Sequence, residues 1–150
     1  MIRFKGRSTL KQYMPLKPIK RGYKVWVRAD ESGYIFVSSK YIQAKLQEVK
    51  QSLLGERVVK DLTEKLSGSN HKVFFDNFFS SVNLLKDLQA KQIQACGTIR
   101  KDRVNLPHDL ADDRYMVRGA SDWRSTVPGI VVVKWMDQKP VYFKLPRSNR

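Results

Sequence analysis

One stretch of this 150-residue chain decides the fold more than any other, namely Val73-Phe74-Phe75-Asp76-Asn77-Phe78-Phe79-Ser80-Ser81. The apolar run from His71 to Phe75 is bounded by turn residues and predicts a buried β-strand. Ser80 or Ser81 can cap the helix that follows. The apolar face of that helix would consist of Val82, Leu84, Leu85 and Leu88.

Asp76 stands between this strand and this helix. Open α/β sheets bind ligands just beyond the carboxyl ends of their strands, so an acid here faces the usual ligand crevice. Its carboxylate is a hard-oxygen ligand suited to Mg²⁺ or Mn²⁺. Alternatively, the side chain caps backbone donors in the turn between strand and helix. The residues alone leave both roles open.

The same alternation of element types extends on both sides of this stretch. Upstream, Tyr23–Arg28 and Tyr34–Val37 predict two strands of a hairpin, with a turn at Ala29–Gly33. Helical spacing starts at Ile42, is interrupted at Gly55, and is firmest over 58–66. Downstream, 93–99 predicts another strand. The order is that of an α/β fold, a mixed sheet with flanking helices.

Beyond Arg100 the sequence changes character. Residues 101–114 are polar, contain Pro107 and predict a linker. Residues 115–117, 130–135 and 141–145 predict short antiparallel strands, with Asp137-Gln138 at the tip of the last hairpin. We therefore divide the chain into an α/β part, 1–100, and a small β-rich part, 101–150.

The chain is strongly basic, with 29 Lys+Arg against 14 Asp+Glu, a net charge of +15 and a pI near 10.1. Nine basic residues and no acid lie between Met1 and Arg28, and four basic residues and no acid lie between Lys139 and Arg150. Because Pro15 and Pro18 disfavour a helix, Lys11 to Gly22 predicts an extended loop that could follow a phosphate backbone. The candidate DNA contacts are Arg3, Lys5, Arg7, Lys11, Lys17, Lys20 and Arg21. A solvated basic loop without a partner is the alternative.

Several function classes are disfavoured by composition. No apolar run reaches the ~20 residues of a membrane-spanning helix, and Met1–Lys5 does not open an apolar signal sequence. The single Cys96 excludes an internal disulfide framework, and His71 and His108 lack the spacing of zinc ligands. Gly-rich phosphate loops do not occur. The expectation is an intracellular globular protein that binds a polyanion.

Several separated motifs resemble those of piggyBac transposases and of the domesticated piggyBac transposable element-derived proteins. Their order and spacing are compatible with that family over nearly the whole chain. The motifs are Phe4-Lys5-Gly6-Arg7-Ser8, Lys11-Gln12-Tyr13-Met14-Pro15, Lys17-Pro18, Gly55-Glu56, Phe75 to Ser81, Gly97-Thr98-Ile99-Arg100, Arg118-Gly119, Ser121-Asp122 and Val133-Lys134-Trp135-Met136-Asp137.

The resemblance implies a partial RNase H-like fold followed by a β-rich insertion element, and a nuclear location. In that family three aspartates bind two divalent ions, Mg²⁺ or Mn²⁺, which cleave and join strands at TTAA targets. Asp76 matches the second aspartate. The first would precede Met1 and the third would follow Arg150, while Asp30 and Glu31 lie in a predicted turn and are poor substitutes.

One carboxylate cannot hold two metal ions, so we expect a vestigial metal ligand at Asp76, no bound cofactor and no nuclease or transposase activity. The expected function is that of an inactive transposase-derived fragment, with possible non-specific DNA binding through the basic N-terminal block. The alternative is a protein-interaction module, or a non-functional product of a decayed element, that self-associates through exposed apolar surface. An enzyme completed by carboxylates of a partner chain is the least favoured interpretation.

Overall fold

The computed structural model describes residues 1–39, 54–126 and 129–146. The chain divides into two compact units, Met1–Leu53 and Leu54–Arg150, each described here by itself. None of the helices described is long and apolar enough to cross a membrane. The prediction of a helix that starts at Ile42 lies outside the described residues as far as 53.

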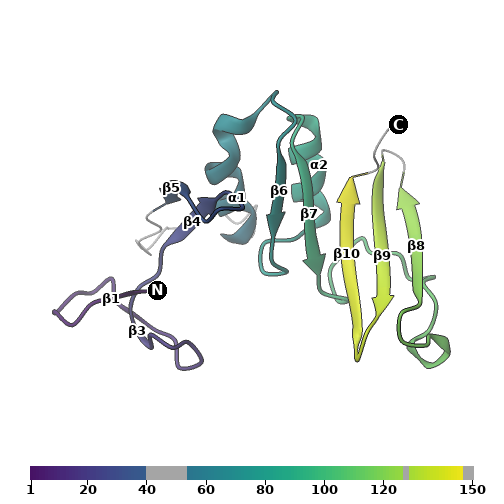
Figure 1. The fold of residues 1–150 in the computed structure, drawn as a ribbon, viewed down its shortest axis with the longest axis horizontal. Helices are drawn as coiled ribbons and strands as arrows, with labels where there is room; N and C mark the ends of the chain where they lie inside the picture. The colour runs from purple at the N-terminus through teal and green to yellow at the C-terminus, as the bar shows by residue number, and fades with distance from the viewer. Residues whose placement is uncertain (40–53, 127–128, 147–150) are drawn as a thin grey trace. The chain divides into compact units, whose positions relative to one another are not determined.

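The second unit is built on a five-stranded sheet in the order β6-β7-β10-β9-β8 (Figure 1). β6 and β7 run parallel, and the other neighbours are antiparallel. The strands are β6 (Lys72–Phe75), β7 (Gln94–Ile99), β8 (Ser121–Thr126), β9 (Ile130–Met136) and β10 (Pro140–Pro146). This mixed sheet with few helices confirms the predicted α/β class.

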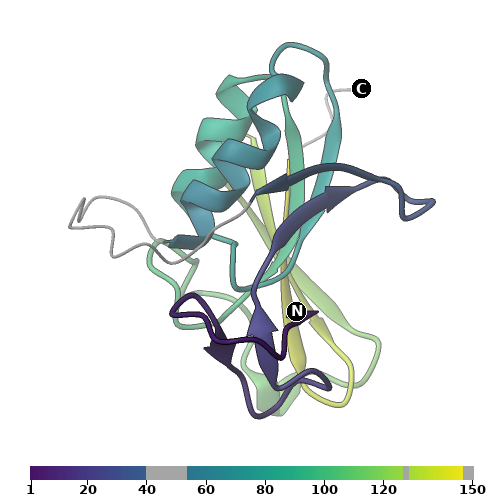
Figure 2. The same cartoon turned by 90° about the vertical axis from the view of Figure 1, so that its left-hand side faces the viewer.

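Two α-helices lie side by side on one face of this sheet, α1 (Leu54–Thr63) and α2 (Val82–Ala90) (Figure 2). A short 3₁₀ turn, η1 (Glu64–Leu66), continues α1. Gly55 lies inside the first turn of α1, so the predicted interruption at that residue is wrong. The ion pair between Lys60 Nζ and Asp87 Oδ2, 2.5 Å long, links the two helices.

The start of α2 follows the sequence prediction closely. Ser81 is the N-cap residue, and its hydroxyl oxygen accepts a hydrogen bond from the Leu84 backbone N–H at 3.0 Å. The helix then buries its apolar face against the sheet, where each such side chain contributes about 1.5–3 kcal/mol by leaving water. The buried core consists of Val59, Leu84, Leu85, Leu88, Ile93, Ala95 and Ile130.

Residues 101–112 form neither helix nor strand, and 113–114 begin a 3₁₀ turn, but the segment predicted as a linker is fastened to the sheet. Leu106 is buried in a second core cluster with Ile99 of β7 and Val132 of β9. Asp122 accepts a hydrogen bond from the Ala111 N–H at 2.8 Å, and Arg124 forms an ion pair with Asp109 at 2.7 Å. The segment is therefore a packed part of the unit.

Lys134 of β9 adds a buried polar contact to this loop. Its ammonium donates to the Ala111 carbonyl at 2.5 Å and forms an ion pair with Asp113. Burial lowers the pKa of Lys134, but the hydrogen bond to Asp113 and the charge of the Asp113 carboxylate outweigh burial and raise that pKa overall. A charge buried in this way is retained because it is paired.

The strand predicted at residues 115–117 is wrong. Tyr115 ends a 3₁₀ turn, η2 (Asp113–Tyr115), and the edge strand is β8. The sequence Ser121-Asp122-Trp123-Arg124-Ser125 is polar, because an edge strand needs few apolar side chains. The β9–β10 hairpin is confirmed.

The pairing of β10 with β7 joins the two sequence-defined parts in one sheet, since Phe143 lies opposite Thr98 across that pair. In the sequence, the boundary between the two compact units falls between Leu53 and Leu54, not at residue 100. The division into 1–100 and 101–150, as a division of the family's domains, stays a prediction.

The first unit contains a small antiparallel sheet in the order β1-β3-β2. Its strands are β1 (Ile2–Arg3), β2 (Gln12–Tyr13) and β3 (Arg21–Tyr23). The loop predicted over Lys11 to Gly22 therefore contains strand β2 and the start of β3. The prolines lie in the turn between them, where the Met14 N–H donates to the Lys20 carbonyl at 2.8 Å.

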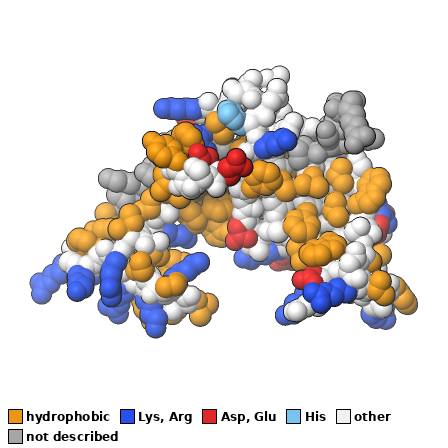
Figure 3. Space-filling view, viewed as in Figure 1, with side chains coloured by type: hydrophobic (Ala, Val, Ile, Leu, Met, Phe, Trp, Pro, Cys, Tyr) orange, Lys and Arg blue, Asp and Glu red, His pale blue; other side chains and the backbone are white. Residues whose placement is uncertain are grey.

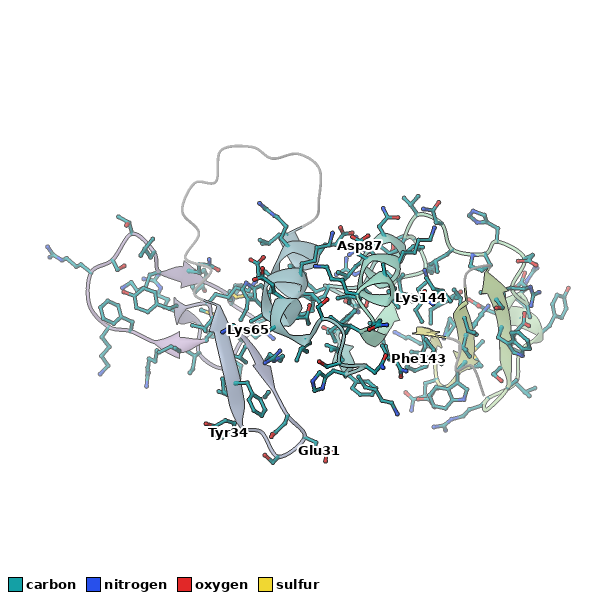
Figure 4. All side chains as sticks on the ribbon, turned by 90° about the horizontal axis from the view of Figure 1, so that it is seen from above. Glu31, Tyr34, Lys65, Asp87, Phe143 and Lys144 are labelled. Atoms are coloured by element: carbon teal, nitrogen blue, oxygen red, sulfur yellow. The ribbon has the colours of Figure 1, made fainter. Side chains whose placement is uncertain are left out.

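The unit also contains the predicted hairpin, formed by β4 (Trp26–Ala29) and β5 (Ile35–Ser39), although Tyr23, predicted as the start of its first strand, belongs to β3. Glu31 and Tyr34 lie at its tip (Figure 4). Asp30 shapes the turn, because its carboxylate accepts hydrogen bonds from Ser32 Oγ at 2.6 Å and the Tyr34 N–H at 2.9 Å. The Ser32 hydrogen bond is the main cause that lowers the pKa of Asp30.

Candidate nucleic-acid interface and the Asp76 carboxylate

Asp76 follows the last residue of β6 and is exposed to solvent. Its Oδ1 accepts a hydrogen bond from the Asn77 backbone N–H at 2.6 Å. Its carbonyl oxygen accepts from the Phe79 N–H at 3.0 Å and from Ser80 Oγ at 3.3 Å. The backbone thus forms a tight turn from Asp76 to Phe79, which is separated from α2 by two residues and presents the carboxylate at the end of the strand.

Two glycines allow neighbouring elements to approach this turn. On β7, a Cβ at Gly97 would lie 2.7 Å from the Phe75 carbonyl oxygen and 2.7 Å from Ser80 Oγ. In α1, a Cβ at Gly55 would lie 2.7 Å from the Phe78 carbonyl oxygen. All three distances are shorter than real Cβ contacts, so any larger residue at either position would force its neighbours to shift. The turn that carries Asp76 is therefore held between strand β7 and helix α1.

This geometry allows the capping role of Asp76 and leaves its carboxylate accessible. The described residues contain no group of three His, Cys, Asp or Glu side chains that could hold a metal ion. Asp76 supplies one carboxylate, of which one oxygen already accepts a backbone hydrogen bond. Two divalent ions need several oxygen ligands, which is more than this one carboxylate supplies.

The seven candidate DNA-binding residues all lie on the β1–β3 sheet or its loops. Arg3 is in β1, Arg21 is in β3, and Lys17 and Lys20 are in the turn between β2 and β3. Lys11 is half-buried and donates to the Gly6 carbonyl at 2.7 Å. The other six side chains are exposed: Arg3, Lys5, Arg7, Lys17, Lys20 and Arg21. Figure 3 shows Lys and Arg side chains gathered over this sheet.

Aromatic rings accompany these cations. The guanidinium of Arg21 lies 5.3 Å from the centroid of the Tyr13 ring, and the rings of Phe4 and Tyr23 are 4.9 Å apart. The cation–aromatic pairing on the sheet was not predicted, because it depends on the register between β2 and β3. The presence of Tyr13 among the cations was the available signal.

A second pairing of this kind follows β3. Lys24 Nζ lies 4.1 Å from the centroid of the Trp26 ring. Burial is the main cause that lowers the pKa of Lys24, and the charge of Lys17 lowers it further. The Lys17 effect means that positive charges crowd in this unit, which favours a polyanionic partner.

Comparison with known proteins defines the class of protein. Residues 1–145 match the family model described as "Transposase IS4". The match covers nearly the whole chain, and the chain therefore belongs to this transposase family.

The relatives are derived from piggyBac transposable elements. The chain is 37% identical over 150 residues to human PiggyBac transposable element-derived protein 3, covering 94% of this chain and 25% of that protein. It is 30% identical over 148 residues to human PiggyBac transposable element-derived protein 2, covering 94% and 25%. The chain thus spans about a quarter of the length of these relatives.

A solved structure described as a cryo-EM structure of the piggyBac transposase synaptic complex with hairpin DNA is also similar. Its TM-score is 0.86 at 27% sequence identity, over 98% of this chain and 31% of the transposase chain. The fold is accordingly that of part of the RNase H-like catalytic domain of a piggyBac transposase. The resemblance indicated by the sequence motifs is confirmed.

Proposed function

We propose that this 150-residue polypeptide binds duplex DNA without sequence preference through the β1–β3 sheet, does not cut it, and acts in the nucleus. The observation that carries the proposal is the placement of six exposed cations on one small sheet and its loops, in a segment without any acid before Asp30. Cations that neutralise phosphates release condensed counterions, which favours binding regardless of sequence. The DNA-containing complex of the similar transposase supports the choice of polyanion.

The binding test compares two variants that lose the same charge at different places. The first replaces four exposed cations of the sheet by glutamine: Arg3, Arg7, Lys17 and Lys20. The control replaces four exposed lysines of the second unit: Lys65, Lys72, Lys91 and Lys139. By fluorescence anisotropy on a duplex of about 20 base pairs, we expect about a 100-fold loss of affinity for the first variant. The loss of affinity in the control variant should be less than a tenth of that in the first variant. An equal loss of affinity in both variants would refute the assignment of DNA binding to the sheet.

Catalytic inactivity of this polypeptide is supported by the single carboxylate at the end of β6. One carboxylate cannot position two ions for in-line displacement at a phosphate. Supercoiled plasmid incubated with the protein and Mg²⁺ or Mn²⁺ should therefore remain supercoiled. Nicking by the wild type that disappears in Asp76→Ala would show that the carboxylate is active and would overturn the proposal.

A second candidate function, an interaction module that self-associates, is favoured by the apolar face of the five-stranded sheet that lies opposite to α1 and α2. Phe74 is 73% exposed, Trp123 is 60% exposed and Trp135 is 39% exposed. The strand registers place all three on one face, opposite to the face that buries Ala95 and Val132. Exposed apolar area of this kind marks an interaction surface.

A second copy of the chain is the proposed occupant, because β9 and β10 carry no charged residue on this face. The side chains there are Val131, Val133, Trp135, Val141, Phe143 and Leu145. Sedimentation velocity should give a mass that rises with protein concentration. The variant Trp135→Lys should remain monomeric, whereas Lys139→Gln should behave as wild type. A wild type that stays monomeric at all concentrations would exclude this function.

A further inference from the structure

We infer that the β1–β3 sheet is a stacking site for unpaired nucleotides, in which a base lies on the ring of Tyr13 and an adjacent phosphate on Arg21. This inference rests on the proposed DNA binding and names the form of nucleic acid that the site accepts best. It makes Tyr13 a base-binding residue, whereas duplex binding alone would use only the cations.

The register of the sheet brings the required groups to one face. Tyr13 pairs with Arg21 across β2 and β3, and Ile2 pairs with Tyr23 across β1 and β3. Because residues two apart on a strand share a face, Tyr13, Arg21, Tyr23 and Ile2 all point to the same side. Phe4, two residues beyond Ile2, reaches that side too and contacts Tyr23 with ring centroids 4.9 Å apart.

The exposure of this face distinguishes it from a packed core. Tyr13 is 61% exposed and Ile2 is 57% exposed. A ring so exposed contributes little to folding, yet it offers a π-face on which any base can stack. The guanidinium of Arg21, 5.3 Å from the ring centroid, adds a cation at the position that the phosphate of a stacked nucleotide would approach.

Further cations lie in the turn beside this face. Lys17 and Lys20 lie in the turn that joins β2 to β3, next to the paired residues Tyr13 and Arg21. Both lysines are exposed. Aromatic rings accompanied by cations are the combination that single-strand binding proteins use, with rings for the bases and cations for the backbone.

The pair Arg114 and Tyr115 shows why a cation near a ring is not sufficient. There the guanidinium lies 5.8 Å from the ring centroid, and Tyr115 is 81% exposed. However, Arg114 forms an ion pair with Asp112 at 2.8 Å, and Asp113 is adjacent in the chain. A phosphate would meet these carboxylates. Arg21 lies instead in a segment whose nearest acid in sequence is Asp30.

The test separates bases from phosphates. Anisotropy measures the affinity of the full chain for three ligands of equal length, about 12 nucleotides: oligothymidine, an abasic strand with the same phosphates, and a duplex. We expect oligothymidine to bind about tenfold more tightly than the abasic strand, since stacking of one base contributes a factor of this order. Tyr13→Leu should lose this advantage and keep the wild-type affinity for the abasic strand and the duplex.

Two further variants keep the result interpretable. Tyr13→Phe retains the ring and should bind oligothymidine like wild type. Tyr115→Leu removes an equally exposed ring elsewhere and should change nothing. Equal affinity of the wild type for oligothymidine and the abasic strand would overturn the inference. A uniform loss of affinity for all three ligands in Tyr13→Leu would also overturn it, because the ring would then have a structural or protein-binding role.

Failure of this inference can be told apart from failure of the proposed function. If the duplex binds and a base-containing strand has no advantage over the abasic strand, only the stacking site is wrong. If none of the three ligands binds at low salt, DNA binding by the sheet is wrong, and the stacking site with it.

Discussion

Replacing Lys144 by methionine is expected to raise the free energy of unfolding at pH 7 by about 2–3 kcal/mol. Lys144 is on β10, where it pairs with Gly97 of β7 and Val132 of β9, and only 1% of its surface is exposed. It lies on the side of the sheet covered by α2 (Figure 4). Burial, followed by the charge of Lys86 on α2, lowers the pKa of Lys144 from 10.5 to about 8.

The sign of this effect follows from proton binding. Below pH 8 both the folded and the unfolded chain carry the proton on Lys144, so the cost of burying the charge is fully present. Between about pH 8 and 10.5 the folded chain has lost the proton while the unfolded chain still binds it. Stability due to this group therefore rises with pH across that window. Methionine has a similar length and no charge, so it removes the cost at every pH.

Urea unfolding followed by circular dichroism at pH 7 and pH 10 measures this difference. At pH 7 the variant should be more stable than wild type, and at pH 10 the two should approach each other. Lys139→Met, which removes an exposed lysine on the same hairpin, should leave stability unchanged within about 0.5 kcal/mol. A Lys144→Met protein that is less stable than wild type at pH 7 would contradict the assignment of Lys144 as a destabilising buried charge.

Gly97→Ala is expected to lower the free energy of unfolding by about 3 kcal/mol, at the upper end of the range for overpacked cores. The new methyl group would meet the Phe75 carbonyl oxygen at 2.7 Å, and a backbone atom of a paired strand cannot move alone. Either β6 separates from β7 or the turn after β6 shifts. Since that turn carries Asp76, the substitution should also displace the carboxylate from the end of the strand.

Denaturant unfolding gives the stability change, and the backbone amide resonances of Asp76 and Asn77 report the displacement of the turn. Thr98→Ala is the matched control, because it alters the neighbouring residue of β7 on the opposite face of the sheet. It should cost less than about 1 kcal/mol and leave both resonances in place. A Gly97→Ala protein as stable as wild type would mean that β7 does not hold the turn.

Local patterns in the sequence were sufficient for the part of the fold around Asp76. The apolar run before it and the serine caps after it act within a few residues, so the position of β6, the N-cap at Ser81 and the buried face of α2 were all predictable. The prediction that this strand is buried is wrong, because β6 is an edge strand of the sheet and Phe74 is 73% exposed. The β4–β5 hairpin was predictable for the same reason, since the Asp30 turn fixes it locally.

Features that depend on long-range pairing could not be predicted from the sequence. β8 has a polar, edge-strand composition, and its place is set by β9. The pairing of β10 with β7 buries Lys144, which in sequence looks like one more cation of a basic tail. The candidate site was likewise predictable only in part. The basic segment was evident in the sequence, whereas the pairing of Tyr13 with Arg21 follows only from the register of β2 and β3.

The salt dependence of duplex binding tests the central claim most directly, namely that this member of a transposase family binds DNA through the cations of the β1–β3 sheet. The logarithm of the affinity should fall linearly with the logarithm of the salt concentration. The variant lacking Arg3, Arg7, Lys17 and Lys20 should have a slope smaller in magnitude by about 3–4, because each phosphate that is no longer neutralised changes the slope by about 0.9. The same slope for wild type and this variant, or a wild-type affinity indifferent to salt, would contradict the claim.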